Sequence, residues 1–219
     1  MVTDKSIRKG GYPGNPKNPE HREWIGRNWD IHGAHQFNVM FSLGLREKHD
    51  LLDIGCGSLR GGRFFLVYLL PSHYYAIEPE KWCLEAGIKH EVGQDLIDIK
   101  KPCFDYNEKA NLSVFKTDFD YILAYSIFFH APKIWIEKCL KEVKKVLKKE
   151  GVFAATVMFK KDNNIVANKD EWHYPAVAHY KIETIREIVQ KAGLKMKISG
   201  IKHATNPKIS WIIITHETV

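Results

Sequence analysis

The sequence predicts a mixed α/β fold built on a mostly parallel β-sheet with helices on both faces. Short apolar segments alternate with amphipathic segments through the middle of the chain, an order typical of strand–helix–strand units. Two further strand-like segments, 194–201 and 210–215, follow each other at the C-terminal end. Strands joined by so short a connection form a hairpin only if they are antiparallel. We therefore expect about seven strands, one of which, near the C-terminus, runs against the others.

The first elements lie in the N-terminal part of the chain. Residues 10–20 contain three prolines and three glycines, which excludes regular structure there. Residues 23–45 place bulky side chains near one face of a helix and predict one or two helices. A buried strand over 50–54 then enters a glycine-rich turn, and the apolar helix after it, 64–70, ends at Pro71.

The alternation continues toward the middle of the chain. Segment 74–77 predicts the second strand and 81–90 the next helix. A short third strand is expected over 103–106, and a clearer fourth strand over 119–125. These elements supply the parallel part of the sheet.

The C-terminal part supplies the strongest helical pattern. A helix is expected over 133–149, ended by Gly151 and followed by a strand over 152–159. Another amphipathic helix is expected over 181–192, before the final pair of strands. The apolar residues that repeat at spacings of four, three and four in the first of these helices are Ile136, Leu140, Val143 and Leu147.

Composition limits the class of protein. The chain has 219 residues, enough for one domain, and is 44% apolar and 27% charged, proportions that exclude wholesale disorder. Its longest apolar run, 64–70, has seven residues and is too short to cross a bilayer. The polar start of the chain has no secretory signal, and four scattered cysteines lack CxxC spacing. We therefore expect an intracellular, cytoplasmic protein.

The net charge of +7 is compatible with a nucleic acid or an acidic ligand as partner. Many of the lysines, however, fall within the predicted helix 133–149, and a charge run of this kind usually forms a solvated face. Charge by itself therefore does not select a partner.

The clearest functional signal is the stretch LLDIGCGSLRGG, residues 51–62. A strand leads directly into Gly55 and Gly57, and glycine is needed where the backbone approaches a ligand closely or adopts a positive φ. Amide groups at the start of the following helix can bind a carboxylate or phosphate. Glu78 ends the next strand, where an acid can accept hydrogen bonds from both ribose hydroxyls. Together these residues predict a ribonucleoside pocket at the carboxyl edge of the sheet.

Two cofactors fit such a pocket, a dinucleotide and S-adenosyl-L-methionine (SAM). A dinucleotide turn needs a third glycine beside the pyrophosphate, and Arg60 stands at that position. Asp53 would repel phosphate but suits the ammonium group of a methionine moiety. SAM therefore fits better, and the alternative, an NAD(P) enzyme, would bind a nicotinamide cofactor instead.

Four motifs resemble those of the class I SAM-dependent methyltransferases: DIGCGS, YYAIEP, FDYILAYSIFFHAP and LKEVKKVLKKEGVFAAT. The resemblance covers residues 50–219 and implies a Rossmann-like fold and an enzyme that converts SAM to S-adenosyl-L-homocysteine (SAH). It also implies a methyltransferase core over 50–219, preceded by a helical or lid segment over 1–49. A narrower resemblance, through EHREWIGRNWDIHGAHQF and GSLRGG, is to a subgroup that includes sugar O-methyltransferases acting on glycans of large algal viruses.

The resemblance also implies roles for individual residues. The glycine turn would surround the methionine and ribose parts of the cofactor, and the acid after the second strand would bind the ribose hydroxyls. Adenine contacts are expected from the end of the third strand, at Tyr106 or Asn107, and Ser126 would lie beneath the transferred methyl group. The residues expected at the cofactor are Asp53, Gly55, Cys56, Gly57, Glu78, Pro79, Asn107 and Ser126.

Methyl transfer to an aliphatic hydroxyl needs a base, and histidine suits that role near neutral pH. His130 is the first candidate because it follows the fourth strand at the edge where the sulfonium should lie; the alternative is a packing or capping role before Pro132. His173 is the second candidate, in the loop after the fifth strand, and the alternative is a surface histidine. His179 and His203 are weaker candidates.

An acceptor site is expected beside these histidines. Tyr12, His21, Trp24 and Tyr174 combine aromatic surfaces with hydrogen-bonding groups, a mixture that suits sugars, and the first three belong to the segment expected to form a lid. Trp29 is expected to dock its helix on the sheet instead. We find no cluster with metal-ligand spacing. Asp170 and His173 could contribute two ligands to a divalent-ion site.

These observations favour a SAM-dependent O-methyltransferase with a histidine base, acting on a sugar, glycan or other small polar acceptor. One alternative is an RNA methyltransferase, although the sequence after the fourth strand, 125–128, reads YSIF rather than the Asn-Pro-Pro-Tyr type of amino-methylation motif. Another is a non-catalytic module that binds SAM. Nucleic acid and membrane are not expected as partners.

Overall fold

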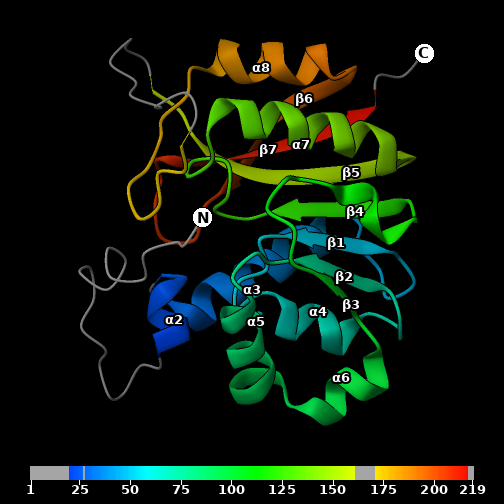
Figure 1. Cartoon of the computed structure of the whole chain (residues 1–219). Coiled ribbons are helices and arrows are strands. Elements are labelled where there is room, and N and C mark those ends of the chain that lie inside the picture. The colour runs from blue at the N-terminus through cyan, green and yellow to red at the C-terminus, as the bar shows by residue number, and fades with distance from the viewer. Residues whose placement is uncertain (1–19, 27, 161–170, 217–219) are drawn as a thin grey trace.

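The computed structural model describes residues 20–26, 28–160 and 171–216. Within these ranges the strands form one seven-stranded sheet in the order β3-β2-β1-β4-β5-β7-β6 (Figure 1). Strands β1 to β5 pair in parallel, whereas β7 is antiparallel to both β5 and β6. The predicted fold class and the antiparallel strand near the C-terminus are therefore confirmed. The strands are β1 (Leu51–Ile54), β2 (Tyr74–Ile77), β3 (Cys103–Asp105), β4 (Phe119–Ala124), β5 (Leu147–Met158), β6 (Leu194–Lys202) and β7 (Ile209–His216).

Helices cover both faces of this sheet. The α-helices are α2 (Glu20–Trp24), α3 (Trp29–Ser42), α4 (Gly62–Tyr68), α5 (Lys81–Gly87), α6 (Gln94–Lys100), α7 (Lys133–Val146) and α8 (Ile182–Lys191). A π-helical turn, η1 (Ile88–Val92), continues α5, and a 3-10 turn, η2 (Leu112–Phe115), precedes β4. In the described ranges, no helix has both the length and the apolar character that a membrane span requires.

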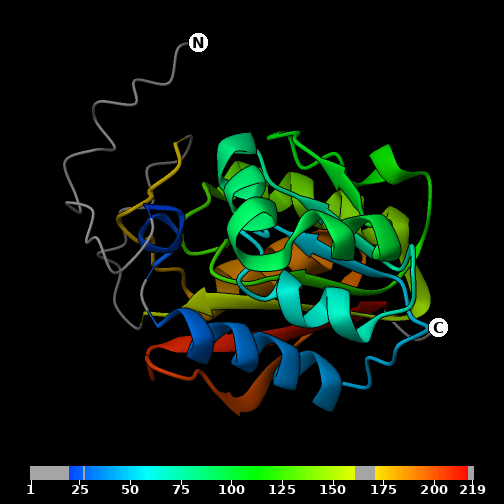
Figure 2. The same cartoon turned by 90° about the horizontal axis from the view of Figure 1, so that it is seen from below.

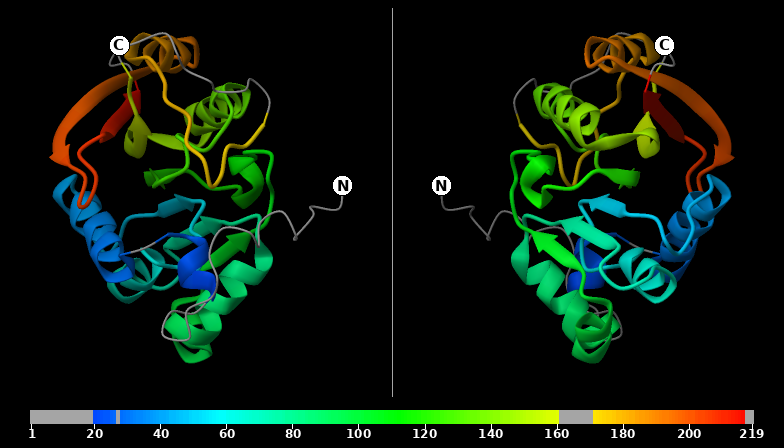
Figure 3. Two further views of the ribbon diagram at one scale, coloured as in Figure 1. Left: turned by 90° about the vertical axis from the view of Figure 1, so that its left-hand side faces the viewer. Right: turned by 90° about the vertical axis from the view of Figure 1, so that its right-hand side faces the viewer.

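The two faces of the sheet have separate apolar cores, because successive side chains of a strand point to opposite faces. Leu52 and Ile54 of β1 pack with α7 and α8 on one face (Figure 1). Leu51 of the same strand packs with α3 and α4 on the other, where α3 runs beside β7 (Figures 2 and 3). Helix α3 therefore shares an apolar core with one face of the sheet. The carboxyl ends of the parallel strands lie between the helices of this face and those of the other face.

Several predicted boundaries are wrong in detail. The helix expected over 133–149 ends at Val146, because Leu147 pairs with Phe119 of β4 and the chain is already in β5. Gly151 consequently lies inside a strand rather than ending a helix. The helix expected over 81–90 is present, as α5 to Gly87 and then as the π-helical turn η1 to Val92. Helix α6 and turn η2 were not expected from the sequence.

Candidate cofactor and acceptor site

The glycine-rich turn after β1 is fixed against the end of β2. The main-chain N–H groups of Gly55 and Cys56 donate to the Ile77 carbonyl at 2.8 and 3.3 Å. Gly55 and Gly57 have φ values of 73° and 58°, in the left-handed region that glycine adopts without strain. The Ile25 side chain lies over the second glycine, since a Cβ on Gly57 would be 2.9 Å from its Cγ2. Helix α4 begins a few residues later, so its N-terminal end faces the same edge.

We expect Gly55→Ala to destabilise the protein. A non-glycine residue at this φ loses about 1–2 kcal/mol, and the new methyl group would also collide with Ile127. Chemical denaturation measures the loss. The matched control is Gly200→Ala in β6, where a Cβ would meet no atom within 4 Å, and which should lose no stability. Equal stability of the two variants would contradict the requirement for glycine at position 55.

Glu78 follows β2 and faces this turn. It is 8% exposed, and its Oε2 accepts a hydrogen bond from the Gly57 N–H at 2.8 Å, while its Oε1 accepts one from the Glu80 N–H at 2.9 Å. Each carboxylate oxygen can accept a further bond, so the group can still receive two hydroxyls. Burial raises the pKa of Glu78 to about 7, and the two N–H donors oppose that rise.

The other residues expected around the methionine part are enclosed. Asp53 is buried, and its Oδ2 accepts a hydrogen bond from the Tyr74 hydroxyl at 2.8 Å; burial raises its pKa to about 7. Its carboxyl group therefore lies within the core below the turn. Cys56 is also buried, and burial raises the pKa of its thiol.

The end of β3 forms the far side of the site. Asn107 is occupied by its own loop: its Nδ2 donates to Asp105 Oδ1 at 2.5 Å, and its Oδ1 accepts the Asn111 N–H at 2.9 Å. Tyr106 is 40% exposed and Pro79 is exposed as well, so two rings are open beside Glu78. These rings are better placed than the Asn107 amide to border a flat base.

Ser126 follows β4. Its φ is 61°, and its main-chain N–H donates to Thr156 Oγ1 of β5 at 2.7 Å. This bond fixes the backbone at the point where the chain leaves the sheet.

Three of the predicted acceptor and catalytic residues form one aromatic cluster. The ring of Tyr174 lies 5.5 Å from that of Trp24 and 5.0 Å from that of His130. The Tyr174 hydroxyl also donates to the Trp24 carbonyl. The cluster therefore joins α2, the loop after β4 and the loop before α8.

His130 is held in one orientation within this cluster. Its Nδ1 lies 2.7 Å from the carbonyl of Ala176, which can only accept, so Nδ1 carries the proton and Nε2 keeps a lone pair. Burial lowers the pKa of His130 to about 4. The N–H of His173 donates to the His130 carbonyl at 2.8 Å, and within the described ranges its buried Nε2 has no hydrogen-bond partner.

The remaining candidates lie in the packing of the N-terminal helices or outside the described residues. His21 is buried and bonded to Glu91 at 2.7 Å, beside Arg22, so it ties α2 to η1 instead of facing an acceptor. Trp29 is buried, as expected for a docking residue. Tyr12 and Asp170 lie outside the described residues. Among the described residues, no group of three or more His, Cys, Asp or Glu side chains is arranged to hold a metal ion.

A second polar cluster was not expected as a site. The Tyr125 hydroxyl lies 2.6 Å from His32 Nδ1 and 2.7 Å from His203 Nε2, which joins the end of β4 to α3 and to the β6–β7 connection. Burial lowers the pKa of His32 to about 3 and that of His203 to about 4. Only the position of Tyr125 directly after a strand could have indicated it, because the histidines are distant in sequence.

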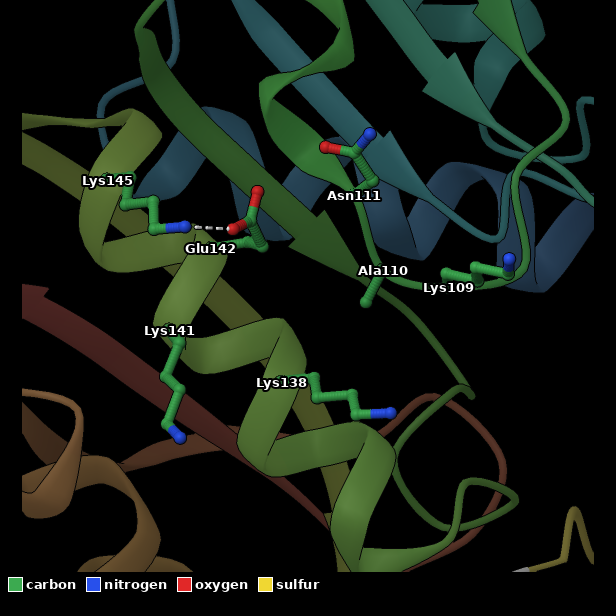
Figure 4. A pocket seen from close by; sticks show the side chains of 7 residues that line it. All are labelled: Lys109, Ala110, Asn111, Lys138, Lys141, Glu142 and Lys145. Atoms are coloured by element: carbon green, nitrogen blue, oxygen red, sulfur yellow. Dashed lines mark hydrogen bonds and ion pairs between the residues drawn. The ribbon is translucent and has the colours of Figure 1, made fainter.

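A shallow basic groove lies elsewhere, along the outer side of α7 (Figure 4). Its one carboxylate, Glu142, accepts hydrogen bonds from Lys145 at 2.5 Å and from Ser113 at 2.8 Å. The groove shares no residue with the glycine turn or the aromatic cluster. It is lined by Lys109, Ala110, Asn111, Lys138, Lys141, Glu142 and Lys145.

Comparisons with known proteins agree with this geometry. A methyltransferase from Clostridium acetobutylicum described as SAM-dependent superposes with a TM-score of 0.62 at 14% identity, covering 88% of this chain and 93% of that one. The magnesium protoporphyrin IX methyltransferase of Synechocystis PCC 6803 with bound SAM gives 0.63 at 12% identity, covering 98% and 92%. A glycopeptide N-methyltransferase in complex with SAM gives 0.63 at 10% identity, covering 84% and 94%. A search of curated proteins gives no match.

The fold and the glycine turn thus define a class I, Rossmann-like methyltransferase architecture. Residues 52–155 match the family model described as a methyltransferase domain. Residues 52–155 are therefore a methyltransferase domain, and the fold of the chain is that of SAM-dependent methyltransferases.

Proposed function

We propose that this methyltransferase acts on a hydroxyl group of a sugar, glycan or other small polar acceptor, with His130 as the general base. The observation that carries the proposal is the His130–Tyr174–Trp24 cluster. It combines a histidine that has a lone pair on Nε2 with two aromatic rings, and His130 belongs to the loop that follows β4.

The residues of the carboxyl edge fit the cofactor. SAM, when bound, supplies an electrophilic methyl group on a sulfonium. Glu78 has two carboxylate oxygens with spare acceptor capacity and would bind the ribose hydroxyls. Tyr106 and Pro79 would border the adenine, and the turn at Gly55 and Gly57 would lie along the ribose and methionine parts. Burial of Glu78 excludes water from its carboxylate, which strengthens the polar contacts of this group.

His130 would remove the acceptor proton through Nε2. Donation from Nδ1–H to the Ala176 carbonyl fixes the ring and stabilises the protonated state that forms as the methyl group is transferred. Because its pKa is about 4, the free side chain is neutral at physiological pH, so its Nε2 carries a lone pair. His173, which hydrogen-bonds the backbone of His130, is the second candidate for this role.

The acceptor class is inferred from the chemistry of the cluster. Trp24 and Tyr174 present ring surfaces, and sugars bind such surfaces through their C–H faces. The structurally similar enzymes include one for a porphyrin and one for a glycopeptide, so the fold alone does not select an acceptor.

An acceptor screen with methyl-labelled SAM tests the proposal. We expect label in deoxysugars and simple glycosides, and none in the same glycosides after all hydroxyls have been methylated. A pool of RNA and a set of simple amines are the competing acceptors. Transfer to RNA or amines alone would contradict the proposed acceptor class, and binding of SAM without transfer to any compound would favour the non-catalytic alternative.

A further inference from the structure

Arg60 is a buried cation in the glycine-rich turn. It is 7% exposed and forms no salt bridge with any described carboxylate; Nη1 donates to the Ile25 carbonyl at 3.0 Å. Its Nε is sealed from solvent and has no hydrogen-bond partner within the described ranges. Nη2 also forms no hydrogen bond within the described ranges. Unlike Nε, it is not fully buried. Because a buried charge without a paired charge is costly, a guanidinium in this state indicates a missing anion.

Nε and Nη2, the two donors without a partner, form the side of a guanidinium that binds carboxylates, and Nη2 is the one that a ligand can reach. Nε and Nη2 point in parallel and match the two oxygens of a carboxylate. The same protein uses this fork elsewhere: Arg22 Nε and Nη2 each donate to one oxygen of Glu91 at 2.6 Å. In Arg60 the corresponding pair of donors has no such partner. Asp53, a buried carboxyl group that interacts electrostatically with Arg60, is hydrogen-bonded to Tyr74 instead.

The second polar cluster holds Arg60 in place. The guanidinium carbon lies 5.6 Å from the centroid of the Tyr125 ring, within the range of a cation–π contact. His203 Nδ1 accepts the N–H of Asn206 at 3.2 Å, so its Nε2 carries the proton and donates to the Tyr125 hydroxyl. The hydroxyl in turn donates to His32 Nδ1. Both histidines are thus neutral, and they fix the ring without adding positive charge beside the arginine.

The position of Arg60 connects the cofactor and acceptor sides of the site. It follows Gly57 by three residues. The Ile25 residue whose carbonyl it holds also lies over Gly57. Its charge acts on both Tyr125 and Tyr174, so the guanidinium lies near the aromatic cluster as well. A carboxylate on either the cofactor or the acceptor could reach it.

We propose that Arg60 binds a ligand carboxylate through Nη2, either the α-carboxylate of the methionine part of SAM or an acid group of the acceptor. The inference rests on the proposed function for its ligands. It assigns to Arg60 a recognition role instead of a purely structural one.

Calorimetry with two related ligands tests the cofactor as the source. SAH carries the amino-acid carboxylate, and 5′-methylthioadenosine has the same nucleoside and thioether without it. We expect Arg60→Met to lose about tenfold or more in SAH affinity and to keep its affinity for methylthioadenosine. Arg60→Lys, which keeps the charge but not the fork, should fall between the wild type and Arg60→Met. The matched control, Arg63→Met, removes an arginine of α4 that pairs with Asp30, and should bind both ligands normally.

Thermal shifts of the SAH-loaded protein test the acceptor as the source. If the carboxylate belongs to the acceptor, glucuronate should stabilise the wild type more than glucose does, and Arg60→Met should lose that difference while it binds SAH normally. Equal losses for SAH and methylthioadenosine, or no change with any of the four ligands, would overturn the proposal. If Arg60→Met fails to fold, the affinities of Arg60→Lys for the same ligands provide the test. A wild-type protein that binds neither SAH nor methylthioadenosine would instead refute the cofactor site itself.

Discussion

His130→Ala should lower turnover by about 10²–10⁴-fold and leave SAH affinity essentially unchanged. In the proposed mechanism Nε2 takes the acceptor proton, whereas no cofactor contact is assigned to the ring. Transfer of labelled methyl to an acceptor found in the screen measures turnover, and calorimetry measures SAH affinity. Above about pH 6 the wild-type rate should not depend on this group, because its pKa is about 4 and the neutral form prevails.

Two controls separate proton removal from general disturbance. His73→Ala removes a histidine that bonds to Asp50 at 2.8 Å, at the opposite, amino ends of the strands, and should keep full turnover. His173→Ala tests the second candidate. Full activity of His130→Ala together with a large loss in His173→Ala would transfer the base role to His173, and full activity of both would leave neither side chain as the base.

Glu78→Ala should weaken SAH binding by about 1.5–3 kcal/mol, the loss typical of hydrogen bonds to a charged group. The carboxylate would accept both ribose hydroxyls, and an alanine side chain has no acceptor. Calorimetry checks the value. Glu85→Ala, which removes an exposed acid of α5 paired with Lys81, is the matched control and should bind normally. Unchanged affinity of Glu78→Ala would remove this residue from the ribose site.

The pH dependence of binding is a second signature of Glu78. Burial raises its pKa to about 7, so in the free protein much of this group is protonated at neutral pH. Hydroxyls bind the ionised form better, so affinity for SAH should rise about tenfold between about pH 6 and pH 8. Glu78→Gln should flatten this rise. A rise that persists in Glu78→Gln and disappears in Asp53→Asn would assign the titration to Asp53, whose pKa is also about 7.

Much of the fold could be predicted because its signals are local. Alternation of apolar and amphipathic segments indicated the parallel sheet, and the short connection before β7 indicated the antiparallel strand. The end of α7 was predicted wrongly because it depends on a contact between residues that are distant in sequence. The apolar spacing of a helix continues through Leu147, but pairing with Phe119, a residue distant in sequence, draws that stretch into β5.

The sequence by itself determined the α/β sheet, the glycine turn and the acid that follows the second strand, since each depends on residues within one strand and its turn. Only the tertiary structure decided which side chains meet across segments. Trp24, His130 and Tyr174 come from three distant parts of the chain, and the buried Arg60 contacts Ile25 and Tyr125, which are also distant from it in sequence. Such contacts have no periodic signature, because they arise from how separate elements pack and not from the conformation of any one of them.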